Sequence, residues 1–189
     1  MLNPSDFIWS DFFWTSSVQL EAWRGYQTRR GPYAIQDVVT PTDGFVKIVI
    51  SPEGRDACPL SDSEIATAEW AIAHQAEMQQ SFLAALLKYY GGLRPKLLPF
   101  LSRHGDPTSM PRVETKDGFR DLIGPSTLNI HPVQKNGLPY IGLELGCSWD
   151  IEHGLGVLFH GARVVEIGGA DTAILLWIAE KDAGVFEHP

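Results

Sequence analysis

Cysteine is scarce in this chain, and its two copies, Cys58 and Cys147, lie far apart in the sequence. Their separation matches neither the short spacing of a zinc-ligand pair nor that of a redox-active pair. A disulfide framework is also unnecessary, because a domain of 189 residues can bury about 70% of its unfolded surface in a single core. We therefore predict one domain over residues 1–189, with two reduced thiols as in cytoplasmic proteins.

Basic residues are few as well. The chain has 15 Lys and Arg against 23 Asp and Glu, which gives a net charge of −8. Clustered Lys and Arg carry most of the affinity for nucleic acids, so this balance argues against a nucleic-acid partner. An acidic surface instead suits a basic protein partner, although the same charge also serves solubility.

Long apolar runs are missing. The longest, residues 173–179, is far shorter than the roughly 20 residues that a membrane-spanning helix needs. The first residues lack the positively charged segment and apolar core of a signal peptide. We expect a soluble, cytoplasmic protein without a membrane partner.

The stretch 143–169 holds the clearest strand signals. Residues 140–146, 155–160 and 164–168 alternate side chains with a period of two, which predicts three strands. Only Gly161 and Ala162 separate the last two, and glycine at the first central position suits a type II′ hairpin. An antiparallel meander is the expected result.

One long helix is predicted over residues 61–90. Ser61 and Glu64 form a capping-box pattern at its start, and apolar residues then recur with the helical period. The glycines at 91–92 predict its end. Four prolines between residues 95 and 111 argue against a long helix beyond that point.

Further strands are predicted at 45–51, at 128–131 and, in a shorter form, at 33–39. The aromatic run 7–14 and the alternation after it predict two strands around residues 15–17. Their aromatic side chains are expected in the core rather than on a stacking platform.

Near the end of the sequence, Asp171 can cap a helix that reaches about Glu180, although residues 173–179 would also suit a buried strand. The predicted fold class is α+β, with a mostly antiparallel sheet packed against one long helix.

The candidate site is the connection 148–154, between the first two strands of the meander. The predicted binding residues are Trp149, Asp150, Glu152 and His153, with Glu144 on the preceding strand. Asp150, Glu152 and His153 are also the candidate catalytic residues.

Carboxylates and imidazoles brought together by strands and a turn can bind zinc or manganese, here with Glu144, His131 or His160 as further ligands. The competing interpretation is structural. In it, Asp150 and His153 satisfy backbone groups, Gly154 supplies an unusual φ, and Trp149 packs on the sheet. No dinucleotide loop, phosphate loop or serine elbow is complete, so no cofactor is predicted.

The run Trp149-Asp150-Ile151-Glu152-His153-Gly154-Leu155-Gly156-Val157 resembles a signature of an uncharacterised bacterial family of domains of unknown function, Trp-Asp-x-Glu-His-Gly-Leu-Gly-Val. The similarity extends to residues 9–14, to 23–25 and to the helix that ends at 89–90, and so covers most of the chain. The resemblance implies a small soluble protein, and some relatives lie near toxin and immunity genes. It implies no activity.

Two functions follow as hypotheses. The first is a non-catalytic binding or interaction module, comparable to an immunity protein. The alternative is a small metal-dependent enzyme, a hydrolase, that uses the loop with Asp150, Glu152 and His153. A bound metal would favour the enzyme, and an exposed acidic or aromatic face would favour the binding module.

Overall fold

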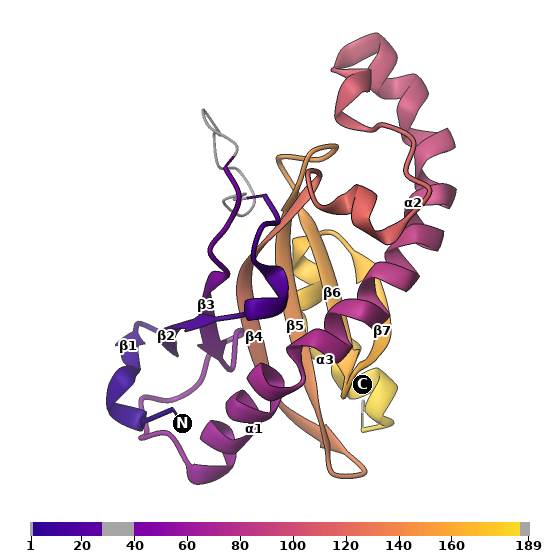
Figure 1. Cartoon of the computed structure of the whole chain (residues 1–189). Helices are drawn as coiled ribbons and strands as arrows, with labels where there is room; N and C mark the ends of the chain where they lie inside the picture. The colour runs from indigo at the N-terminus through magenta and orange to yellow at the C-terminus, as the bar shows by residue number, and fades with distance from the viewer. Residues whose placement is uncertain (1, 28–39, 186–189) are drawn as a thin grey trace.

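The computed structural model describes residues 2–27 and 40–185. A seven-stranded sheet lies at its centre (Figure 1). In spatial and sequence order the strands are β1 (Ile8–Ser10), β2 (Phe13–Gln19), β3 (Phe45–Ile50), β4 (Ile123–Lys135), β5 (Leu138–Cys147), β6 (Leu155–His160) and β7 (Arg163–Gly168). All neighbours pair antiparallel except β3 and β4, which are parallel. The predicted mostly antiparallel α+β fold is confirmed.

The meander of β5, β6 and β7 is confirmed. Gly161 has φ +56°, the left-handed value that the hairpin between β6 and β7 requires at its first central position. The strand predicted at 128–131 belongs to β4, which begins earlier, at Ile123. The short strand predicted at 33–39 lies outside the described residues.

Two helices fill the crossover from β3 to β4. They are α1 (Asp62–Ala73) and α2 (Gln75–His104). The predicted capping box is present, because the Ser61 hydroxyl accepts from the backbone N–H of Glu64 and the Glu64 carboxylate accepts from that of Ser61. One continuous helix was predicted, but the helix is interrupted at His74, whose Nδ1 lies 2.8 Å from the carbonyl oxygen of Trp70.

The predicted helix end at residues 91–92 is wrong, and so is the expectation that the prolines prevent a helix after it. Helix α2 continues through Pro95 and Pro99 to His104. Leucines at 93, 97 and 101 pack against the core at helical spacing, and Arg94 Nε donates to the carbonyl oxygen of Met110 at 3.0 Å. Tertiary contacts of this kind outweigh the low helix propensity of glycine and proline. Figure 1 shows this part of α2 projecting beyond the sheet.

Among the described residues, no helix is both long and apolar enough to cross a membrane.

The first face of the sheet carries the main core. Helices α1 and α2 cover it, and side chains such as Ile48, Leu143 and Val157 pack against helix residues such as Phe82 and Leu86. The other face is called the second face below. The 3₁₀ segment η5 (Ala170–Ala173) and helix α3 (Leu176–Ala183) cover part of it, around a smaller cluster of Tyr140, Leu158, Ile178 and Ala179.

The predicted C-terminal helix is therefore confirmed with a later start, at Leu176, and the alternative of a buried strand over 173–179 is wrong. The described residues also form four other 3₁₀ segments: η1 (Pro4–Asp6), η2 (Glu21–Trp23), η3 (Pro107–Ser109) and η4 (Lys116–Phe119). Within the described chain, Cys58 is exposed, Cys147 is buried, and no disulfide joins them.

The N-terminal hairpin differs from its prediction. Its turn lies at Asp11 and Phe12, so residues 15–17 are in the middle of β2. Asp11 takes φ +54°, which an aspartate tolerates better than most residues. The predicted core role of the aromatic run is also wrong for Phe12, which is 67% exposed, because this hairpin forms the edge of the sheet.

Two glycines allow η5 to lie directly on the sheet. A Cβ atom at Gly142 would overlap the carbonyl oxygen of Ala173, and one at Gly156 would overlap that of Gly169. The backbone of η5 therefore approaches β5 and β6 more closely than any side chain at these positions would permit.

We expect Gly142→Ala to lower the free energy of unfolding by about 2 kcal/mol or more, because η5 must move away from the sheet. Gly92→Ala is the matched control. It lies in α2, where an added methyl group would meet open space, so it should raise stability by about 0.5–1 kcal/mol. Urea unfolding of both variants measures this, and equal stability of Gly142→Ala and the wild type would contradict the close approach.

Candidate functional site

Hydrogen bonds between residues of the predicted loop 148–154 hold it in a closed turn. Asp150 Oδ1 accepts from the backbone N–H of His153 and lies 3.0 Å from His153 Nδ1. Gly154 takes φ +65° and donates to the carbonyl oxygen of Asp150. Trp149 is buried, with its ring 4.9 Å from that of Tyr90. Asp150 thus satisfies a backbone group and Gly154 takes the unusual φ, as the structural interpretation expects, whereas the His153 ring contacts the Asp150 side chain. A binding role for Trp149, Asp150, Glu152 and His153 stays a prediction.

The other predicted ligands have partners of their own. Glu144 Oε1 accepts from Asn129 Nδ2 at 2.8 Å. Burial raises the pKa of Glu144, against the opposing effects of Asn129 and Lys47. His160 Nε2 lies 2.9 Å from the carbonyl oxygen of Lys135. Across residues 2–27 and 40–185, no group of three or more His, Cys, Asp or Glu side chains is placed to hold a metal.

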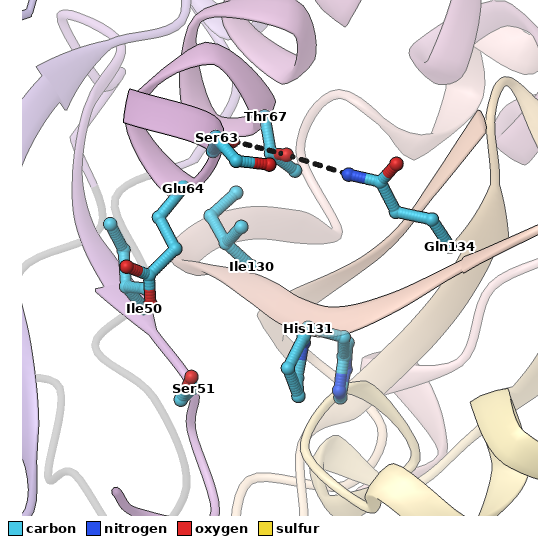
Figure 2. A pocket seen from close by; sticks show the side chains of 9 residues that line it. Ile50, Ser51, Ser63, Glu64, Thr67, Ile130, His131 and Gln134 are labelled. Carbon is cyan, nitrogen blue, oxygen red and sulfur yellow. Dashed lines mark hydrogen bonds between the residues drawn. The ribbon is translucent and has the colours of Figure 1, made fainter. Parts of the chain in front are cut away.

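A cavity that sequence reasoning missed lies where the parallel pairing of β3 and β4 ends. Their register runs to the pair Ile50 and Ile130, after which Ser51 donates its N–H to the carbonyl oxygen of Ile130 at 2.9 Å. Ser51 takes φ +58°, a strained value for serine. A cavity of about 50 Å³ lies next to this point, between α1 and the two strands. Figure 2 shows Ser63, Glu64 and Thr67 on α1 and Ser51 after β3, whereas the side chain of His131 points away from α1.

His131 is the most deeply buried polar residue that lines this cavity, with 2% of its surface exposed. Its Nε2 lies 3.1 Å from the carbonyl oxygen of Ala173, which can only accept, so Nε2 carries the proton. Burial lowers the pKa of His131 to about 4, and the bond to Ala173 offsets only part of this effect. The ring is therefore neutral at pH 7, and its Nδ1 lone pair has no protein partner among the described residues.

The α1 side of the cavity is polar without a net charge. Thr67 Oγ1 donates to the carbonyl oxygen of Ser63 at 2.8 Å and accepts from Gln134 Nε2 at 3.2 Å. The Glu64 carboxylate forms an ion pair with Arg55 and also closes the capping box. Its negative charge is thus balanced within the protein.

A groove of about 270 Å³ adjoins the cavity along α1. The two spaces share Ser63, Thr67 and Gln134, and the groove continues to Trp70 and Pro139. The Trp70 ring is stacked on His74, with centroids 4.1 Å apart. We call cavity and groove together the α1 cleft. Its signal in the sequence is faint: Ser51 and His131 each stand directly before a proline, Pro52 after β3 and Pro132 within β4.

Comparison with known proteins gives a family. A family model described as a domain of unknown function (DUF6985) matches residues 19–175. The match includes the predicted loop and the α1 cleft and excludes β1. No curated protein and no solved structure matches the chain.

We expect Asp150→Ala to lower the free energy of unfolding by about 1 kcal/mol, because the backbone N–H of His153 loses its acceptor. Glu152→Ala should change it by less than about 0.5 kcal/mol, because Glu152 is exposed. Urea unfolding measures both. About one equivalent of a transition metal in the purified protein, lost in Glu152→Ala and in His153→Ala, would contradict a purely structural loop.

The burial of His131 predicts sensitivity to acid. The unfolded histidine protonates below its usual pKa of 6.5, whereas the folded one resists protonation until about pH 4. Stability is therefore full above pH 6.5 and falls as the pH drops through this window. From pH 7 to pH 5 the wild type should lose about 2 kcal/mol more than His131→Asn. The free energy of unfolding is measured with urea at both pH values. Equal losses in the wild type and in His131→Asn would show that His131 does not cause the effect.

Proposed function

Because the chain belongs to the DUF6985 family, whose description assigns no activity, we propose its function from its own surface. The protein is a non-catalytic interaction module of the bacterial cytosol that binds a basic protein partner, as an immunity protein does. It needs no cofactor for this role.

The supporting observation is the uncovered part of the second face. Segment η5 packs on β5 and β6, and α3 packs on β4 and β6. On the strands near the other edge, Ile8 is 72% exposed and Phe45 is 55% exposed. Both side chains belong to the second face, since Ile8 pairs through Thr15 with Val49, four residues after Phe45. Exposed apolar side chains on an uncovered sheet face are typical of protein-binding surfaces.

Charge around these side chains favours a basic partner. The exposed acids Asp6, Asp11 and Asp43 lie next to them in the sequence, and the whole chain carries −8. Exposed apolar side chains with charged residues near them in the sequence resemble the composition of protein interfaces, where rim charges speed association. We call Ile8, Phe45 and these acids the interaction face.

The metal-dependent hydrolase has less support. Asp150 and His153 bind each other, and Glu152, Glu144, His131 and His160 each lie apart from a common ligand set in the described structure. No observation favours this alternative.

We expect the double variant Ile8→Ser/Phe45→Ser to lose at least tenfold in affinity for the protein partner, because two apolar contacts near the centre of the interface are removed. The partner is first captured from cells with the wild type and identified, and its Kd is then measured by calorimetry at low and high salt. A basic partner should bind more weakly at high salt.

Phe100→Ser serves as the matched control. Phe100 is 58% exposed, much like Phe45, but lies on the projecting part of α2. The proposal fails if the captured protein binds the double variant as tightly as the wild type, or if Phe100→Ser weakens binding to the same degree.

A further inference from the structure

One part of strand β2 has a free edge. Strand β1 pairs only with Phe13, Trp14 and Thr15, whereas β3 pairs with β2 as far as Gln19. On the side away from β3, residues 16–19 therefore have no neighbouring strand in the described part of the chain. We call residues 16–19 the free edge. Unpaired backbone groups at the edge of a sheet can form hydrogen bonds with an added strand.

The direction of the backbone identifies the groups that are free. In an antiparallel ladder, the N–H and C=O groups of successive residues point to opposite sides of the strand. Leu20 donates its N–H to the carbonyl oxygen of Gly44, on the side of β3. Val18, two residues earlier, points the same way, so Ser17 and Gln19 direct their backbone groups away from β3. Both residues thus offer an N–H and a C=O group to an incoming strand.

The free edge lacks the features that usually protect the edge of a sheet. It contains no lysine and no proline, and its pairing with β3 runs without a register shift. Strand β7 at the opposite edge differs, because its pairing with β6 has a register shift and its exposed positions carry Arg163 and Glu166. Proteins use charged side chains and bulges to prevent an edge strand from pairing with another chain. The edge at β7 is therefore protected, and the free edge of β2 is not.

A groove of about 360 Å³ lies between the free edge and helix α1. Its volume is within the range of small-molecule sites. Leu2, Val18, Ile72 and Ala73 make its lining largely apolar. Directly opposite residues of two paired strands share one face of the sheet, so a residue opposite Val18 would direct its side chain toward α1. An added segment of about four residues would extend roughly 13 Å along the free edge.

The charges around the groove favour a basic segment. Asp6 lies at one end of the free edge, because its carbonyl oxygen accepts from Ser16 Oγ at 2.8 Å. Asp43 lies at the other end, because its carbonyl oxygen accepts from Gln19 Nε2 at 3.0 Å. Glu69 lines the groove itself, and no lysine or arginine does so among the described residues. The three carboxylates attract the Lys and Arg side chains of a partner.

The free edge also adjoins the interaction face. Residues of an added strand that pair with Ser17 and Gln19 would place their side chains on the second face. Gln19 is itself paired with Phe45 on β3. An added strand would therefore extend the surface that already holds Ile8 and Phe45.

We propose that the basic partner binds by strand addition: an extended segment that alternates apolar and basic residues pairs with Ser17 and Gln19 and directs its apolar side chains into the groove beside α1. The basic character of the partner rests on the proposed function, whereas the free edge and the groove do not. In complexes of this kind, main-chain hydrogen bonds provide affinity, and pockets for alternate side chains provide specificity.

The test uses the full chain labelled with ¹⁵N and a synthetic probe, a capped six-residue peptide in which valine alternates with lysine. In the free protein, the amide protons of Ser17 and Gln19 should exchange with solvent much faster than those of Ser16 and Val18, which face β3. Saturating peptide should slow the exchange of Ser17 and Gln19 about tenfold or more and leave the amides of β7 unchanged.

Two pairs of variants locate the binding site. Ser17→Pro should weaken the peptide at least tenfold, because proline has no N–H to donate, whereas Ser17→Ala keeps this N–H and should bind as the wild type does. The second pair leaves the strand intact. Ala73→Phe should fill the groove and weaken the peptide to a similar degree, whereas Ala66→Phe, at an exposed position of α1 outside this groove, should not.

A peptide with glutamate in place of lysine should bind at least tenfold more weakly. The proposal is overturned if the lysine peptide leaves the exchange of Ser17 and Gln19 unchanged, if Ser17→Pro and Ser17→Ala bind it alike, or if the glutamate peptide binds equally well.

The peptide also separates this proposal from the proposed function. Peptide binding at the free edge, with a captured partner that ignores Ile8→Ser/Phe45→Ser, would support strand addition and refute the interaction face. A captured partner that depends on Ile8 and Phe45, with no binding of the peptide, would do the reverse.

Discussion

Because β3 and β4 are parallel, the chain must return from one end of the sheet to the other before β4 can pair. Residues 51–122 make this crossover, and they contain both α1 and α2. The helices therefore lie over the first face and form the main core with it. The same pairing places the end of β3 beside Ile130 of β4, with the first turns of α1 next to it, and this is where the cavity lined by Ser51 and His131 forms. Ends of adjacent parallel strands are a common place for ligand sites in sheets with crossover helices.

The packing of the second face depends on the absence of a side chain at Gly142. The same packing also determines the hydrogen bonding of His131. With no side chain at Gly142, the carbonyl oxygen of Ala173 lies directly on β5. That oxygen also accepts from His131 Nε2. The close approach of η5 thus fixes the tautomer of His131 and leaves the lone pair on Nδ1. A methyl group at residue 142 would therefore disturb both the packing of η5 and the hydrogen bond of His131.

Local sequence patterns predicted the structure correctly where interactions between residues close in the sequence determine it. The two-residue period of residues 155–160, the turn at Gly161 and the capping box at Ser61 all describe interactions within a few residues, and all three are present. The end of α2 was mispredicted because leucines at 93, 97 and 101 stabilise it through contacts with distant residues. The exposure of Phe12 follows from the edge position of β1, which composition does not reveal. Of the site, the sequence indicated the hydrogen bonding of Asp150 and His153. It did not indicate the α1 cleft, since Ser51 and His131 are joined only by a parallel pairing across the long crossover.

The buried, neutral state of His131 carries a cost for the fold. An apolar side chain in its place would avoid both an unpartnered acceptor and the loss of stability in acid, each of which amounts to a few kcal/mol at most. Native stabilities are only about 5–15 kcal/mol, so such a cost is a substantial fraction of the total. Buried polar atoms without a protein partner are rare, and in folded proteins they are usually satisfied by water or by a ligand. Next to it, Ser51 adopts a strained backbone conformation, and strain of this kind concentrates at binding sites. Ser51 and His131 therefore both carry a cost for the fold, next to the point where the pairing of β3 and β4 ends.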